Sequence, residues 1–221
     1  FQNWEEVYAH TDEHGTLIQP NAQPGDIRFK DLNHDGVLDA NDKTFIGNPY
    51  PDLMMGINLS MRYKRIDFAA NFYGTFGNDI FNLTKGLYSG ANGSNVWAGT
   101  LNEAWHGEGT SNDIPRLSYS DLNLNYNRVS SFYVEDGSYM RCKLLQIGYT
   151  LPEKWVGGSQ LRISFSAQNP FTITGYSGMD PERPMADGTT DSGGGSAINT
   201  GIDNTAYPNP RTFLFGIDFK F

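Results

Sequence analysis

The residues best suited to chemistry form one short run of oxygen-bearing side chains, Asp31-Leu-Asn-His-Asp-Gly-Val-Leu-Asp-Ala-Asn-Asp42. Its spacing fits a twelve-residue loop in which oxygens at positions 1, 3, 5, 7, 9 and 12 hold calcium. Gly36 stands at position 6, where the loop turns sharply. The predicted ligands are Asp31, Asn33, Asp35, the backbone carbonyl of Val37, Asp39 and Asp42. We therefore expect a structural Ca²⁺ site here, with no catalytic role.

This loop departs from the usual pattern at its last position. Asp42 stands where a bidentate Glu is normal, so the shorter side chain requires a closer backbone. In this respect it resembles the calcium loops of dockerin modules. The alternative is a polar turn that binds no ion. No other metal or nucleophile arrangement is evident, so we expect no enzyme, and the four histidines are expected at the surface.

The elements around this loop alternate between apolar and polar residues. In Arg211–Phe221, Phe or Ile occupies every second position from Phe213 onward, and the intervening residues are mostly polar. Such a period of two predicts a strand with one apolar face. Taken alone, this segment fits both a soluble β-sandwich and a β-barrel of the bacterial outer membrane. The same alternation predicts four further strands, at about 53–64, 66–78, 139–151 and 161–169.

The lengths of strands and connections favour the barrel. Strands of about 9–13 residues match a tilted crossing of a bilayer, whereas soluble strands are usually about 5–6 residues long. The connections alternate between short turns and the two long loops 79–138 and 174–210, which is typical of outer-membrane barrels. Short turns lie on the periplasmic side, so we expect residues 1–52 and both long loops outside the cell and the C-terminus in the periplasm. The aromatic residues expected at the periplasmic rim are Tyr63, Tyr149, Trp155 and Phe221.

Composition excludes some classes of protein. The chain of 221 residues has a net charge of −9, and no basic patch stands out, which argues against nucleic-acid binding. One cysteine, Cys142, excludes an internal disulfide framework.

Arg141 and Lys143 share the parity of the apolar face, so we expect them at the outer end of their strand, close to lipid phosphates. Five strands do not close a barrel, because open edges in lipid leave backbone groups unpaired. We therefore expect the chain to be part of a larger protein.

Several motifs together resemble the SusC/RagA-type TonB-dependent transporters of the Bacteroidetes. They are Pro24-Gly-Asp-Ile-Arg-Phe-Lys-Asp-Leu-Asn-His-Asp-Gly-Val-Leu-Asp39, Ile46-Gly-Asn-Pro-Tyr-Pro-Asp52, Phe72-Tyr-Gly-Thr-Phe-Gly-Asn-Asp-Ile-Phe-Asn82, Ser138-Tyr-Met-Arg-Cys-Lys-Leu-Leu-Gln-Ile-Gly-Tyr-Thr-Leu-Pro152, Ser166-Ala-Gln-Asn-Pro-Phe-Thr172 and Tyr207-Pro-Asn-Pro-Arg-Thr212. The family pattern has Leu where this chain has Cys142. The resemblance spans nearly the whole chain.

The resemblance implies an all-β fold, the five C-terminal strands of a 22-stranded transmembrane β-barrel with a plug. It implies import of oligosaccharides or peptides, powered by TonB through an N-terminal part absent from this chain. A SusD-like surface lipoprotein, the rest of the transporter chain and outer-membrane lipid are the implied partners, with transporter–lipoprotein pairs forming dimers. Phe221 would serve as an assembly signal. The alternative from another class is a secreted, calcium-stabilised β-sandwich that binds glycans.

Overall fold

The computed structural model describes residues 1–88, 95–182, 200–204 and 207–221. The chain divides into two compact units. The loop unit consists of Phe1–Gly47 and Asn82–Val134, and the strand unit consists of Asn48–Phe81 and Glu135–Phe221. Residues 82–134 thus belong with the N-terminal segment, although the sequence analysis treats them as a loop between two strands.

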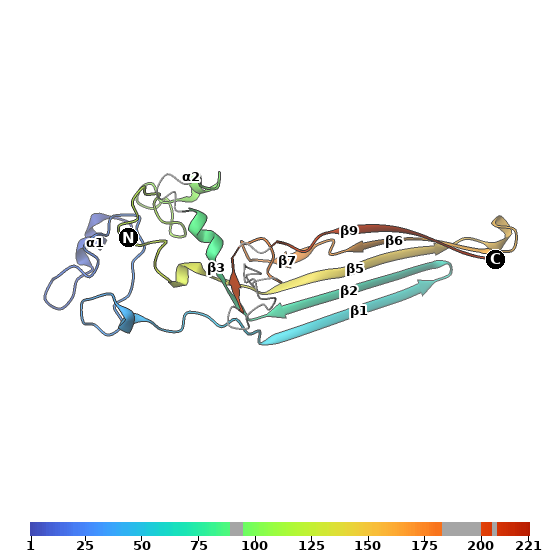
Figure 1. The fold of residues 1–221 in the computed structure, drawn as a ribbon, viewed down its shortest axis with the longest axis horizontal. Coiled ribbons are helices and arrows are strands. Elements are labelled where there is room, and N and C mark those ends of the chain that lie inside the picture. The colour runs from blue at the N-terminus through green and yellow to red at the C-terminus, as the bar shows by residue number, and fades with distance from the viewer. Residues whose placement is uncertain (89–94, 183–199, 205–206) are drawn as a thin grey trace, which may run out of the picture. The chain divides into compact units, whose positions relative to one another are not determined.

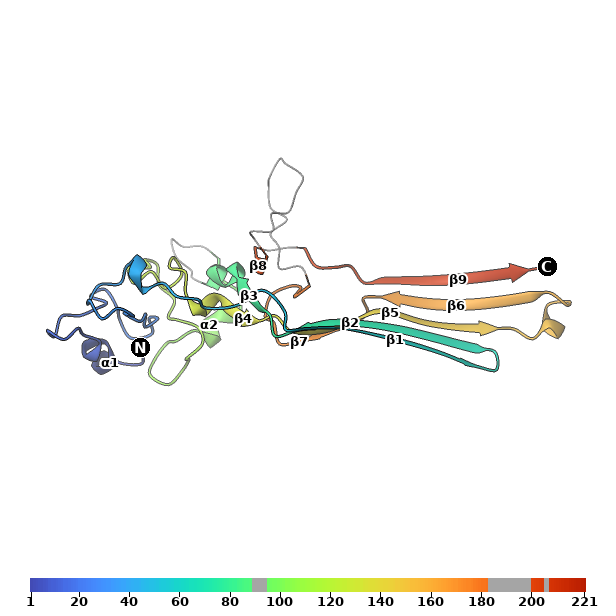
Figure 2. The same cartoon turned by 90° about the horizontal axis from the view of Figure 1, so that it is seen from below.

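Five long antiparallel strands dominate the strand unit, and neighbours in the sheet follow the order of the chain (Figure 1). Figure 2 shows the same strands from a second side. They are β1 (Leu53–Tyr63), β2 (Ile66–Phe76), β5 (Tyr139–Thr150), β6 (Gln160–Gln168) and β9 (Thr212–Lys220). Four of the predicted strand ranges contain one of these strands, and the fifth, 161–169, overlaps β6, which begins one residue earlier at Gln160. β9 pairs with β6 along its whole length, as expected.

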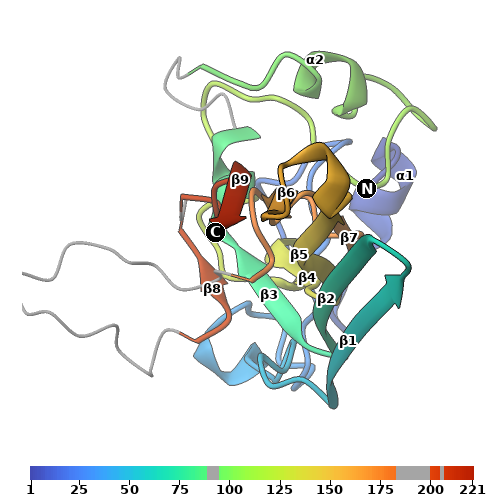
Figure 3. The same cartoon turned by 90° about the vertical axis from the view of Figure 1, so that its right-hand side faces the viewer.

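The pairing registers align the alternating side chains into continuous rows, and Figure 3 shows the strands following one another when seen end-on. One apolar row is Met61, Phe68, Ile147, Phe165 and Phe215. The next is Tyr63, Ile66, Tyr149, Ile163 and Ile217. Because side chains alternate between faces, these rows share one face of the sheet and the intervening residues share the other.

The opposite face is largely polar or small. One of its rows is Arg62, Asp67, Gly148, Ser164 and Gly216. Arg162 forms an ion pair with Asp67 at 2.6 Å and with Asp218 at 3.2 Å. These contacts join β2, β6 and β9, and they pass over Gly148 of β5, where a Cβ atom would lie 2.4 Å from Arg162 Nη2. The absence of a side chain at Gly148 is what lets the pair cross the sheet.

A β-bulge interrupts the pairing of β2 with β5. Asn71 pairs with Leu144, but the next residue, Phe72, pairs with Cys142, so Lys143 is the extra residue. Beyond this point β5 also exchanges its other neighbour. Leu144–Thr150 pair with β6, whereas Tyr139–Arg141 pair with the short strand β7 (Thr172–Thr174). The bulge therefore divides β5 into two parts with opposite side-chain parity.

The remaining elements are short. A small sheet has the order β4-β3-β8, formed by Val134–Asp136, Asp79–Asn82 and Ile202–Asp203. The helices are α1 (Trp4–Ala9) and α2 (Thr100–Glu103), and the 3₁₀ turns are Ala40–Asp42, Leu83–Tyr88, Ser131–Tyr133 and Glu153–Trp155. In α1 the side chain of Asn3 caps the helix by accepting from the Glu6 amide. None of the described helices has the length and apolar character needed to cross a membrane.

A substitution of Gly148 tests whether the polar face depends on its missing side chain. Gly148→Ala should lower the free energy of unfolding by about 1 kcal/mol, because the new methyl group displaces the Asp67–Arg162 pair. Denaturant unfolding of the full-length protein that carries this chain would measure the change.

Gly56→Ala in β1 is the matched control, since its Cβ would meet only one backbone oxygen at 4.0 Å. Adding a methyl group to an unstrained strand glycine is neutral or slightly stabilising, because it restricts the unfolded chain. Equal effects of the two substitutions would contradict the proposed role of Gly148.

Candidate functional site

The apolar face of the strand unit is open, and few described side chains cover it. Phe215 is 83% exposed and Ile217 is 74% exposed, and Met61 and Ile147 of the same rows are also exposed. A continuous apolar face of this size marks an interaction surface, since soluble monomers seldom expose one. It contradicts the soluble sandwich for the described residues, because a second sheet would bury this face.

Aromatic side chains gather at the end of the sheet where β1 runs into β2. Tyr63, Ile66 and Tyr149 lie in one row, and the 3₁₀ turn that contains Trp155 follows β5 at the same end. Phe221 directly follows β9 at this end (Figure 1). All four predicted aromatic residues are exposed. Amphipathic rings at the border of an apolar surface are typical of a membrane interface.

Arg141 lies on the polar face, which corrects the prediction that it faces lipid. Parity counted back from Leu145 puts Arg141 on the apolar face, but the bulge at Lys143 resets the parity and pairs Arg141 with Tyr73. The residue Arg141 is 4% exposed, and its guanidinium forms ion pairs of 2.5 Å with both Asp180 and Glu182. Its Nε donates to Thr172 Oγ1 at 2.8 Å.

Lys143 joins the same ionic cluster through Glu182, and its ammonium lies 6.0 Å from the ring centre of Tyr73. Asn209, just before β9, donates from its amide to Asp180 at 2.9 Å and from its side chain to Glu182 at 3.0 Å. Burial raises the pKa of Asp180, but hydrogen bonds from Arg141 and two backbone amides outweigh it and hold the pKa below its usual value. The cluster thus fixes two distant chain segments against β5.

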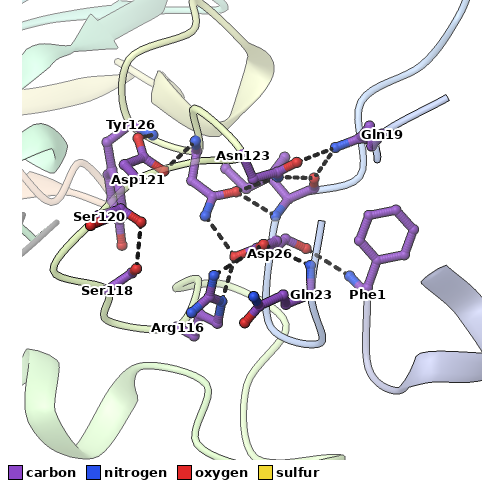
Figure 4. Close-up of polar contacts among 12 residues, drawn as sticks. Phe1, Gln19, Gln23, Asp26, Arg116, Ser118, Ser120, Asp121, Asn123 and Tyr126 are labelled. Atoms are coloured by element: carbon purple, nitrogen blue, oxygen red, sulfur yellow. Dashed lines mark hydrogen bonds and ion pairs between the residues drawn. The ribbon is translucent and has the colours of Figure 1, made fainter. Parts of the chain in front are cut away.

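The loop unit is held by buried polar groups. Asp26 is 2% exposed and lies at the centre of Figure 4, where Arg116 Nε donates to it at 2.7 Å. Asn125 donates to the same carboxylate at 2.9 Å, and the Gln23 amide donates at 2.8 Å. Asn123 and Gln19 extend the network to the backbone carbonyl of Ile27. These bonds offset the cost of burying a charge and connect residues about a hundred positions apart.

The predicted calcium loop is present as a compact turn in the loop unit. Both oxygens of Asp31 accept backbone amides, from His34 at 2.7 Å and Gly36 at 2.8 Å. Both oxygens of Asp42 do the same, from Leu32 and Asp39, each at 2.8 Å. These hydrogen bonds lower the pKa of Asp42, and the bond from the Asp39 backbone amide has the largest effect. Gly36 has the positive φ of 82° that the motif requires.

The donors in this loop suit calcium in kind, but they do not converge. Asn33 donates to Asp35, and Asp39 accepts from Asn41. In the part of the chain that the structure describes, no group of three His, Cys, Asp or Glu side chains is placed to hold a metal. Metal binding would require the carboxylates to turn away from the amides. Calcium therefore stays a prediction.

The sequence analysis did not single out the residues that hold the loop unit together. Asp26 lies in the Pro24–Asp39 motif, but Arg116 and Asn125 lie in none of the quoted motifs, and the burial of the Asp26 carboxylate becomes evident only after folding. The prediction that His10 lies at the surface is also wrong. It is 8% exposed, its Nε2 lies 3.1 Å from the Phe29 carbonyl, and burial lowers its pKa.

Sequence comparison places these features among known proteins. No protein-family model matches the sequence. The chain is 39% identical over 207 residues to the TonB-dependent receptor P3 of Formosa agariphila, covering 92% of the chain and 20% of that receptor. It is 28% identical over 221 residues to the TonB-dependent receptor SusC of Bacteroides thetaiotaomicron, covering 93% of the chain and 18% of the receptor.

The structural comparison agrees in fold. The solved structure of the RagAB peptide transporter matches with a TM-score of 0.61 and 24% identity, over 84% of this chain and 19% of that chain. The chain belongs to the SusC/RagA-type TonB-dependent receptors. Receptors of this family are outer-membrane proteins, and the long strands of this receptor segment match their barrel. The segment spans about a fifth of the length of the relatives it matches.

Removing Arg141, the more buried of the two cations in the ionic cluster, tests the role of this residue in the receptor segment. Arg141→Met leaves Asp180 buried without its partner, so the free energy of unfolding should fall by about 3–5 kcal/mol. Lys143→Met is the matched control. The Lys143 side chain is 34% exposed, so its loss should cost at most about 1 kcal/mol. Equal losses, measured by denaturant unfolding, would contradict a central role for Arg141.

The acid dependence of stability provides a second measurement on the same pair. The pKa of Asp180 is lower in the folded state, so its contribution is complete above the unfolded pKa of about 4 and is lost as pH falls through the folded pKa. Arg141→Met should reduce this loss of stability on the acid side.

Proposed function

We propose that this chain forms part of the wall and the outer loops of a TonB-dependent transporter that imports oligosaccharides or peptides. The observation that carries the proposal is the two-faced sheet, with an open apolar face and a polar face crossed by ion pairs. The apolar face suits lipid, and the polar face suits a water-filled interior. The relatives support this role, since they are TonB-dependent receptors and a RagAB peptide importer. A transport role also agrees with the prediction that the chain is not an enzyme.

The rest of the receptor chain is the first partner in this proposal. β1 and β9 each have one neighbouring long strand among the described residues. A strand edge within lipid needs a hydrogen-bonding partner, so further strands of the same receptor would continue the sheet on both sides. A plug and a segment that contacts TonB would belong to those other parts of the receptor.

The proposal orients the sheet by its connections. The short turn Tyr63–Ile66 and the connection from β5 to β6 lie at the aromatic end, which we place in the periplasm together with the C-terminus. The loop unit and the described residues between β7 and β9 then lie outside the cell. A SusD-like lipoprotein would cover this outer side, and pairs of receptor and lipoprotein would form dimers.

Uptake by intact cells tests transport and partnership together. Deleting the gene for the receptor that carries this chain should abolish growth on its oligosaccharide or peptide, and uncoupling TonB should have the same effect. The tagged receptor should co-purify in detergent with a surface lipoprotein, identified by mass spectrometry. A cysteine at exposed Asn112 should react with an impermeant maleimide on intact cells, whereas one at exposed Gln160 should not.

Each part of the proposal has its own contradicting result. Normal growth without the receptor would contradict import, and purification without a lipoprotein would contradict the partnership. The reverse labelling pattern would invert the orientation and leave transport intact.

We further propose that Asp31–Asp42 binds calcium on the outer side of the receptor, where weak sites of about 10⁻⁴–10⁻³ M would fill. Calcium at 10 mM should then stabilise the folded receptor by about 1.4–2.7 kcal/mol relative to EDTA, seen as a higher melting temperature. Asp31→Asn combined with Asp35→Asn should remove this shift. Asp113→Asn, at an exposed carboxylate of the loop unit, is the control. A shift that survives the double substitution would place calcium elsewhere, and no shift would support an ion-free turn.

A further inference from the structure

The rim of the strand unit contains a cavity between two connections. It lies where the turn from β1 to β2 meets the segment that follows β5, and it has a volume of about 380 Å³. Arg65, Pro152, Glu153, Lys154 and Gln160 contribute to its lining. The Thr150 amide donates to the Arg65 carbonyl at 2.8 Å and holds the two connections together. The cavity, which is open to solvent, is thus bordered by two connections that a backbone hydrogen bond joins.

The charges around this cavity are mostly positive. Arg65 and Lys154 are exposed, and within the described residues neither forms an ion pair. Lys64 precedes Arg65, and its ammonium lies 5.2 Å from the ring centre of Tyr63. Glu153 is the acidic group in the lining. Two cations and one carboxylate line the cavity, so its net charge favours an anion.

The surroundings of the cavity indicate which anion would reach it. Tyr63 and Tyr149 end the apolar rows on this side, and Trp155 follows Lys154 directly. Along the chain, the basic residues Arg65 and Lys154 lie beyond these two tyrosines, in the connections that follow β1 and β5. A bilayer has the matching order of acyl chains, interface and charged headgroups. The basic cavity thus lies at the end of the apolar face, which we propose to contact lipid.

We propose that this cavity binds the phosphate of an anionic phospholipid headgroup, held by Arg65 and Lys154, with Trp155 at the boundary of the acyl chains. The proposal rests on the proposed function, in which the apolar face lies in the membrane. Arg65 offers a planar fork of donors for phosphate oxygens, and Lys154 adds a second positive charge. The negative charge of Glu153 opposes the binding of an anion. A neutral residue at this position should therefore strengthen binding.

Lipid binding to the full-length receptor in detergent tests the site. The probes are short-chain phosphatidylglycerol, phosphatidylcholine with the same chains, and inorganic phosphate. Each basic residue near a lipid headgroup contributes about a fivefold change in affinity, so Arg65→Gln with Lys154→Gln should weaken phosphatidylglycerol binding about 25-fold. Glu153→Gln should strengthen it about fivefold by the same argument. Lys43→Gln, at an exposed lysine of the loop unit, should change nothing.

Each remaining outcome overturns the proposal in a distinct way. Unchanged affinity in the double variant would remove Arg65 and Lys154 as ligands. Equal binding of phosphatidylcholine would show that the headgroup charge does not determine affinity. Competition by inorganic phosphate at the same concentration would show that the site binds anions without selecting lipid. The gain expected for Glu153→Gln cannot arise from misfolding. If the receptor fails to enter vesicles of either lipid, the membrane placement itself is wrong.

Discussion

The strand unit depends on one requirement, that backbone N–H and C=O groups within a bilayer are bonded to a neighbouring strand. Five antiparallel strands meet it for each other in a register that also aligns their side chains. Once the register is set, each apolar position of one strand lies beside an apolar position of the next, and a continuous apolar surface follows. The polar face results from the same pairing, because every second residue points to the opposite side of the sheet.

The loop unit is stabilised by a different kind of interaction, hydrogen bonds between buried polar groups. It has few buried apolar side chains, and much of its interior is Asp26, Asn125, Asn123 and Gln19. Such an interior is stable because its polar atoms bond each other and because Arg116 neutralises the buried carboxylate. Directional bonds specify one arrangement of long loops more sharply than apolar contacts do.

Much of the strand unit could be predicted from the sequence, because a period of two over nine or more residues is a local signal. The strands followed from this signal and the barrel from the lengths of strands and connections, whereas the family followed from the motifs that resemble SusC/RagA-type transporters. The bulge at Lys143 could not be predicted, since one extra residue leaves no mark in composition, and the facing of Arg141 was wrong for that reason. The grouping of residues 82–134 with the N-terminal segment was also hidden. It rests on contacts such as Arg116 with Asp26, which are 90 positions apart in the chain.

The bulge at Lys143 has a consequence for how this strand tolerates change in length. Inserting or deleting one residue in a regular strand turns every later side chain to the wrong face. At Lys143 the extra residue is already accommodated, and its deletion would leave Cys142 opposite Phe72 and Leu144 opposite Asn71 in an unbroken ladder. Arg141 and Leu145 would keep their faces. We therefore expect single-residue insertions and deletions among related receptors to concentrate at this position. Here one residue can be lost without changing the face on which the neighbouring side chains lie.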